Sequence, residues 1–314
     1  MQLMVAPVSA AACMASITSE VMEAVRTMGH AAPPGLTENL MNILQANPGA
    51  STATGIGELI REARQQRRRS QMDLALDVGI SPRHLSFVET GRSRPGAEVL
   101  LAIAERLALP LRTRNTWLLA AGYAPRYSEQ PLASSQMAQI HAALDKLLHA
   151  HDPYPGIVLD GHWNVVRANA AAQRLIALLP AALREPQLNM FRASLHPEGF
   201  AALTQNFAEW GSYLMRALSQ QVQDTHDATM TALLQEVRQY PNVASLQAAP
   251  AEAAVPSLLI PCVLVLGGQR FSLFTTLTSF GTPRDITLAE LSIELFYPSD
   301  PETDTLLHHL GNGG

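Results

Sequence analysis

The sequence has few cysteines, no long apolar run and no positive charge near its start. Its two cysteines, Cys13 and Cys262, stand far apart and match no metal-ligand spacing, which excludes a disulfide framework and fits the reducing cytoplasm. No run reaches the length of a membrane-spanning helix. Residues 1–16 are apolar, but no Lys or Arg precedes Arg26, so the positive region of a secretory signal peptide is missing.

Lysine is absent from the part of the chain where positive charge gathers. Residues 56–126 contain 12 Arg, no Lys and 7 acidic residues, a balance of +5. Residues 127–314 have 9 basic and 17 acidic residues, a balance of −8, and residues 1–55 supply the remaining −2 of the total of −5. One basic segment in a mildly acidic chain is typical of a domain that contacts phosphates. A solvated charged face would explain any single Arg, but not this concentration.

Residues 71–95 have the pattern of two short helices joined by a tight turn. Ser70 and Ser81 can each cap a helix through the side-chain hydroxyl, and Pro82 suits the first position of the second helix. Gly79 supplies the permissive backbone for the turn. The pattern predicts a helix-turn-helix whose second helix enters the major groove of double-stranded DNA. An ordinary pair of packed helices is the alternative.

We expect two groups of DNA-contacting residues around this motif. The start and outer face of the second helix should lie against the bases, which gives Ser81, Arg83, His84, Ser86 and Phe87. Phosphate contacts should come from Arg67, Arg68, Gln71, Arg92 and Arg94. Phe87 could instead pack against a neighbouring helix. Because one helix-turn-helix reads few bases, we also expect a homodimer on two half-sites.

Helical patterns continue on both sides of the motif. Residues 57–67 precede it, and residues 97–109 and 110–122 follow it, each with apolar residues at helical spacing. We therefore expect an all-α, five-helix DNA-binding domain over residues 56–126. Residues 1–55 are expected to be an N-terminal extension, partly disordered or linker, and a true translation start further along the chain would also explain them.

Beyond residue 126 the periodicity becomes mixed. Strand-like runs are found at residues 154–160, 162–168, 258–266, 269–280 and 288–297, and the first two are separated by Asp-Gly, a hairpin signal. Helical runs lie between or before them, at residues 136–148, 169–179 and 200–234. This order predicts an α+β domain of PAS-like order with an antiparallel sheet over residues 127–314.

The second domain lacks the common catalytic motifs. It has no nucleophile elbow, no zinc-protease motif, no phosphate loop and no dinucleotide fingerprint. His149, His151 and Asp152 lie at a helix end beside a proline, where metal binding is not expected. We expect no enzyme activity, no cofactor and no metal, and an enzyme fused to a DNA-binding domain remains the weak alternative.

Bulky apolar residues of the second domain are numerous enough to line a ligand cavity. The expected lining residues are Phe191, Phe207, Trp210, Tyr213, Leu214, Phe274, Leu277 and Phe280. Beside them, Arg192, His196 or Arg216 could bind a carboxylate by a charge-assisted hydrogen bond. The helical stripe among these residues is also typical of plain core. A protein-interaction or dimerisation module without a small ligand is therefore the alternative.

Several segments resemble one family of regulators. They read RHLSFVETGRSRP (83–95), AGYAPRYSE (121–129), HDPYPGIVLDGHWNVVRAN (151–169), LHPEGF (195–200) and TSFGTPRDITLAELSIELFYPSD (278–300). Over residues 56–310 the chain resembles the MmyB-like transcription regulators, which pair an XRE-type helix-turn-helix with a PAS-like ligand-binding domain. The resemblance implies a ligand-responsive bacterial transcription factor for a fatty-acid-like ligand.

Overall fold

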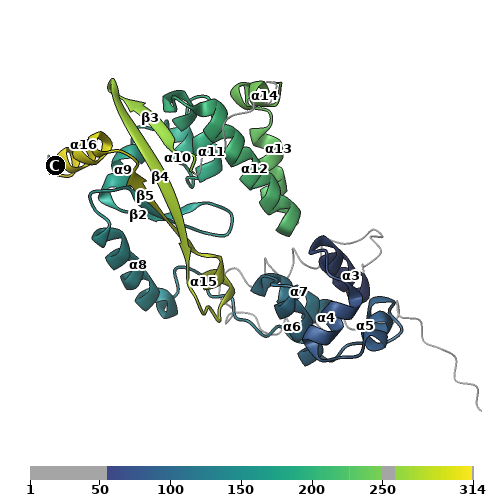
Figure 1. Cartoon of the computed structure of the whole chain (residues 1–314). Helices are drawn as coiled ribbons and strands as arrows, with labels where there is room; N and C mark the ends of the chain where they lie inside the picture. Colours follow the sequence, from purple (N-terminus) through teal and green to yellow (C-terminus); the bar gives the residue numbers. More distant parts are fainter. Residues whose placement is uncertain (1–54, 226, 249–258, 313–314) are drawn as a thin grey trace, which may run out of the picture. The chain divides into compact units, whose positions relative to one another are not determined.

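The computed structural model describes residues 55–225, 227–248 and 259–312 (Figure 1). The N-terminal extension expected over residues 1–55 lies outside this part, apart from Gly55. The first described helices are α3 (Ile56–Gln66), α4 (Gln71–Val78), α5 (Pro82–Glu89), α6 (Ala97–Arg106) and α7 (Leu111–Ala120). They enclose one apolar core that includes Ile60, Leu74, Leu85, Ile103 and Trp117.

The turn between α4 and α5 forms for the reasons that the sequence predicts. The Ser70 and Ser81 hydroxyls each accept a hydrogen bond from the backbone amide three residues further on, at 3.0 and 3.1 Å. Gly79 ends α4 in the left-handed conformation, with φ of 76°. Pro82 occupies the first turn of α5, where no amide donor is needed. The helix-turn-helix is therefore confirmed as a local structure.

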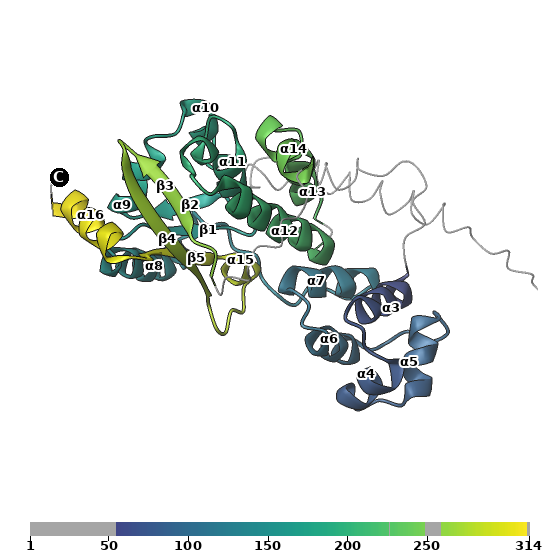
Figure 2. The same cartoon turned by 45° about the horizontal axis from the view of Figure 1, so that its top comes forward.

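The later part of the described chain folds around an antiparallel sheet of five strands (Figures 1 and 2). The strands are β1 (Gly156–Leu159), β2 (Val165–Ala168), β3 (Cys262–Leu266), β4 (Gln269–Ser279) and β5 (Ser292–Pro298). Their order across the sheet is β2-β1-β5-β4-β3, which places the last strand at the centre. This is the strand order of a PAS domain, so the expected α+β, PAS-like fold is confirmed.

Helices cover both faces of the sheet. They are α8 (Ala138–Ala150), α9 (Ala170–Ile176), α10 (Ala181–Arg184), α11 (Met190–Leu195), α12 (Phe207–Thr225), α13 (Ala228–Val237), α14 (Pro241–Ala248), α15 (Ile286–Glu290) and α16 (Pro301–Asn312), with 3₁₀ turns η1 (Ser135–Met137) and η2 (Phe200–Leu203). In Figures 1 and 2, α8 lies on one side of the sheet and α11 to α13 lie on the other. None of the described helices combines the length and the apolar character of a bilayer crossing.

Alternation along the central strand β5 divides its side chains between these two layers. Ile293 and Leu295 pack into the cluster that contains Leu144 of α8. Glu294 and Phe296 point to the opposite face, toward the layer of α11 and α12. The charged side chain of Glu294 therefore lies inside the domain, because both faces of its strand are covered.

The structure corrects three details of the sequence-based elements. The helical run 200–234 is divided into η2, α12 and α13, and Asp227 caps the last of these by accepting from the Met230 amide at 2.9 Å. The strand expected to begin at residue 288 begins at Ser292, because Asp285 first caps the short helix α15. The hairpin loop runs over residues 160–164, and Trp163 takes a positive φ of 65° there.

Candidate DNA interface and ligand cavity

The outer face of α5 presents the side chains that the sequence assigns to base reading. Arg83 is exposed in the first turn, and His84, Ser86 and Phe87 are half-buried beside it. The Arg83 guanidinium lies 5.3 Å from the centre of the Phe87 ring, a cation–π distance. Ser81 is exposed, but its hydroxyl is used to cap the helix. Arg83 and His84 are the residues at the start of the helix that remain available to a groove.

The arginines around α5 fall into two groups. Arg68 and Arg92 are exposed, and neither forms an ion pair within the described residues. Arg67 donates a hydrogen bond to a carbonyl one turn back on α3 at 3.2 Å. Arg94, by contrast, donates to the carbonyl that follows α7, and its guanidinium lies 4.9 Å from the centre of the Tyr123 ring. Arg94 is thus held by its own domain, and the structure gives it a packing role.

A buried carboxylate fixes the end of α5 to its neighbours. Glu89 is only 2% exposed, and its two oxygens accept from Nε and Nη2 of Arg64 at 2.7 and 2.9 Å. Nε2 of Gln71 donates to the same carboxylate at 2.7 Å. These bonds join α3, α4 and α5, so Gln71 has an internal partner where the sequence suggested a phosphate. The pattern of charges alone did not reveal this network.

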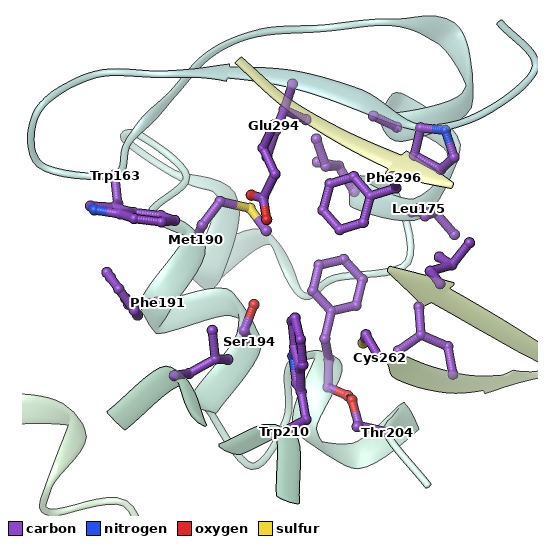
Figure 3. Close-up of a pocket in the computed structure, with 18 residues that line it drawn as sticks. Trp163, Leu175, Met190, Phe191, Ser194, Thr204, Trp210, Cys262, Glu294 and Phe296 are labelled. Carbon is purple, nitrogen blue, oxygen red and sulfur yellow. The ribbon is translucent and has the colours of Figure 1, made fainter. Parts of the chain in front are cut away.

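An apolar cavity lies between the sheet and the helices α9, α11 and α12 (Figure 3). It has a volume of about 70 Å³, within about 790 Å³ of atom-free space that includes its opening to solvent. Its largest lining side chains are Trp163, Met190, Phe191, Phe200, Trp210, Leu214 and Phe296. One water needs about 10–15 Å³ by the same measure, so the cavity suits a slender group and not a bulky ring system.

One carboxyl group, that of Glu294, points into this cavity in Figure 3. Glu294 is 9% exposed and belongs to no ion pair among the described residues. Burial raises its pKa from the ordinary 4.5 to about 7, and a hydrogen bond from Thr275 acts in the opposite direction. Burial, with a smaller contribution from the Glu294 charge, also raises the pKa of the nearby Cys262 thiol to about 12. Glu294 can therefore be neutral or charged near pH 7.

The structure separates the apolar residues that the sequence assigns to the cavity. Phe191, Trp210 and Leu214 line it, and Phe207 packs against the same core without lining it. Four others lie elsewhere, namely Tyr213, Phe274, Leu277 and Phe280. Tyr213 and Leu277 are 41% and 57% exposed. Phe274 stacks on Tyr297 at 5.3 Å and Phe280 packs into the cluster around α8, so both belong to the other face of the sheet.

None of the polar residues expected at the cavity mouth lines this cavity. Arg192 forms a two-bond ion pair with Glu236, with both N–O distances at 2.7 Å. The His196 ring stands edge-on to Tyr240 at 4.9 Å, and Arg216 is exposed on α12. The Glu236 carboxylate also accepts from the Tyr240 hydroxyl at 2.6 Å, so this cluster satisfies its own charges.

A second cavity adjoins the first and carries a different arginine. It has a volume of about 250 Å³ and shares four lining residues with the first cavity, namely Pro155, Leu175, Leu264 and Leu273. Arg174 of α9 lines it, is exposed, and forms no ion pair among the described residues. Arg174 was not among the residues predicted from the sequence to bind a carboxylate. Its place in an Ala-rich helix directly after a strand could have indicated it. Arg174 and Glu294 thus line two neighbouring cavities that share one apolar wall.

One arginine joins the helix-turn-helix region to the sheet region. Arg112, in the first turn of α7, is paired with Glu290 at the end of α15 and with Glu129, each at 2.7 Å. The hydrogen bonds that Arg112 donates to the Glu290 carboxylate are the largest reason that the Arg112 pKa is raised. Residues 56–314 form one compact unit. Because α15 leads directly into β5, Glu290 stands four residues before Glu294 in the chain.

A helix-turn-helix followed by a PAS-like domain with an apolar cavity defines a DNA-binding transcription regulator with a ligand-binding domain. Comparison with family models agrees. The model described as "MmyB-like transcription regulator ligand binding domain" matches residues 140–310, more than half of the chain, and a "Helix-turn-helix" model matches residues 60–113. The chain belongs to the MmyB-like transcription regulators.

Solved structures resemble separate parts of the chain. The clp gene regulator ClgR from C. glutamicum is 23% identical over 24% of this chain and 92% of its own, with a TM-score of 0.20. The PAS domain of BvgS from Bordetella pertussis is 15% identical over 55% of this chain and 99% of its own, with a TM-score of 0.23. An RNA-binding Light-Oxygen-Voltage receptor is 12% identical over 91% of this chain and 69% of its own, with a TM-score of 0.22. No curated protein matches the chain. At these scores the likenesses carry no functional argument.

Proposed function

We propose that this regulator senses a fatty-acid-like amphiphile in the cytoplasm and binds its operator as a homodimer. The observation that carries the proposal is the pair of adjoining apolar cavities with Arg174 at the second. The resemblance to a family with fatty-acid-like ligands points the same way. The ligand acts by a population shift, because it binds one arrangement of the protein better and so changes the placement of two DNA-binding domains.

The cavities suit a ligand with a charged head and a slender apolar tail. The tail lies among Phe191, Trp210 and Leu214, and a carboxylate head reaches the guanidinium of Arg174. Each buried methylene contributes roughly 0.8 kcal/mol, so six of them supply roughly 5 kcal/mol without any further polar contact. Arg174 takes the place of the head-group partners expected from the sequence, which have internal partners or lie off the cavity.

DNA binding follows from the accessible face of α5. Arg83 and His84 read base edges in the major groove, with Ser86 and Phe87 beside them. Arg67, Arg68 and Arg92 contact phosphates, which position the helix without reading sequence. Two such helices in a homodimer address half-sites about 34 Å apart, one turn of DNA.

A larger side chain in the first cavity tests whether a fatty acid binds there. Leu214 lines the first cavity and is 9% exposed, so Leu214→Trp should abolish binding of a medium-chain fatty acid and leave the fold intact. Tyr213→Trp is the matched control, because Tyr213 is 41% exposed on the same helix. Calorimetric titration and mass spectrometry of molecules extracted from the purified chain provide the readouts. A parent protein that neither carries nor binds an amphiphile would overturn the proposal and favour a protein-interaction module.

The Arg112 contact tests how the two regions communicate. Arg112→Ala removes both ion pairs of this residue. Each pair is partly exposed and contributes about 0–1 kcal/mol to stability. We expect ligand affinity to stay unchanged and the ligand-induced change in operator affinity to shrink. Arg106→Ala is the control, because Arg106 is exposed at the end of α6. An undiminished ligand effect in Arg112→Ala would exclude this route.

A further inference from the structure

The carboxyl group of Glu294 is a buried acid without a counter-charge among the described residues. It is nine-tenths buried and points into a mostly apolar cavity. We propose that the natural ligand is a medium-chain hydroxy fatty acid, whose hydroxyl near the far end of the chain donates a hydrogen bond to Glu294 while its carboxylate binds Arg174. This inference rests on the proposed function and adds the chemical class of the ligand.

A plain alkyl chain would leave the two oxygens of the Glu294 carboxyl with a single donor among the described residues, the Thr275 hydroxyl. The remaining polar side chains of this cavity are Ser194, Thr204 and Cys262, and the Thr204 hydroxyl already donates to a backbone carbonyl at 2.8 Å. Buried polar groups in proteins are almost always hydrogen-bonded. A chain that ends in a methyl group displaces water from the carboxyl of Glu294 and offers it no hydrogen-bond donor. A chain with a hydroxyl at this position offers one.

A hydroxyl fits this position better than the other common donors. It can donate to the ionised carboxylate, and it can also pair with the neutral acid, so it suits Glu294 in either state. An ammonium group would have to be fully desolvated, and buried ion pairs often gain little over that cost. A carboxylate at this end would face a like charge or force one of the two acids to hold a proton. The arrangement therefore also fixes the direction in which the ligand enters.

The strand register gives a length scale for choosing a probe. Leu277 pairs with Glu294 across β4 and β5, and Leu273, which lines both cavities, lies four residues along β4. Four residues of strand span about 13 Å. A carbon–carbon bond of about 1.5 Å advances an extended zigzag chain by only about 1.3 Å, so about ten bonds cover this distance. A saturated acid of about ten carbons with a terminal hydroxyl is the matching probe.

The test compares two acids of equal length on the full chain. Isothermal titration calorimetry with 10-hydroxydecanoic acid and with decanoic acid should show at least a tenfold tighter Kd for the hydroxy acid, since a hydrogen bond to a charged acceptor is worth about that factor. Equal affinity for the two acids would overturn this inference and leave the proposed function standing. Absence of binding by either acid, with no amphiphile extracted from the protein, would overturn both.

Variants at the two ends assign the contacts. Glu294→Met removes the acceptor, keeps an apolar side chain of similar size, and should abolish the preference for the hydroxy acid by improving binding of decanoic acid. Arg174→Gln should weaken both acids by the same factor, and Arg216→Gln, on an exposed arginine outside both cavities, should change neither. A preference that survives in Glu294→Met would show that the hydroxyl binds elsewhere and would refute the assignment.

Discussion

Glu294→Gln should change how the stability of this protein depends on pH. The pKa of Glu294 rises from 4.5 in the unfolded chain to about 7 in the folded chain. Between these values the folded state holds the extra proton, so the free energy of unfolding falls as the pH rises from about 4.5 to 7 and is constant above that. A shift of about 2.5 units corresponds to roughly 3 kcal/mol at 1.36 kcal/mol per unit. Gln carries no charge and should remove this fall.

The measurement is urea unfolding of the ligand-free chain at pH 5 and pH 8, followed by far-ultraviolet circular dichroism. Most of the difference lies within this window, so the parent should lose roughly 2–3 kcal/mol more than Glu294→Gln does. Glu302→Gln is the control, because Glu302 is an exposed acid in the first turn of α16. Parallel losses in the parent and in Glu294→Gln would show that the buried carboxyl does not titrate in this range.

Three further outcomes follow from the helix-turn-helix. Arg83→Ala should cost about 1–3 kcal/mol of operator binding and relax the preference at one base position, and a uniform loss across a library of sequences would instead assign Arg83 to phosphate contact. Arg92→Ala should weaken binding to all DNA sequences and lower the slope of log affinity against log salt concentration by about one unit. Arg94→Ala should instead lower the thermal stability of the protein. The reverse result would contradict the packing role of Arg94. Glu89→Ala leaves its arginine partner buried without a counter-charge, so calorimetry should show a loss of about 3–5 kcal/mol in stability, and a loss below 1 kcal/mol would refute the importance of this pair.

The helix-turn-helix was predictable because its signals are local. Ser70, Gly79, Ser81 and Pro82 act on backbone groups within three residues of themselves, so their roles do not depend on the rest of the fold. The partners of Arg94 and Gln71 were not predictable in this way. Each is bound to a residue at least 18 positions away, and from the sequence alone both residues look like ordinary surface polar groups.

The cavity was predictable only in part. Phe191, Trp210 and Leu214 lie on helices whose apolar side has to face the sheet, and they line the cavity. On a strand a difference of one position moves a side chain to the other face, which is why Phe274 lies away from the cavity. Glu294 was missed because a charged residue in an alternating strand normally indicates the solvent side. It is buried because helices cover both faces of its strand.

The positions of the tryptophans give the protein an intrinsic fluorescence signal from its cavity. Trp163 points into the cavity from the loop at residues 160–164, with its indole nitrogen bonded to Gln221 at 2.6 Å, and Trp210 lines the cavity from α12. The chain has three tryptophans, and the third, Trp117, is 3% exposed in the core of the helix-turn-helix. Two of the three indole fluorophores therefore border the cavity, and the remaining one reports on the helices of the helix-turn-helix region. Replacing Trp117 by Phe would leave an emission spectrum that arises only from the walls of the cavity.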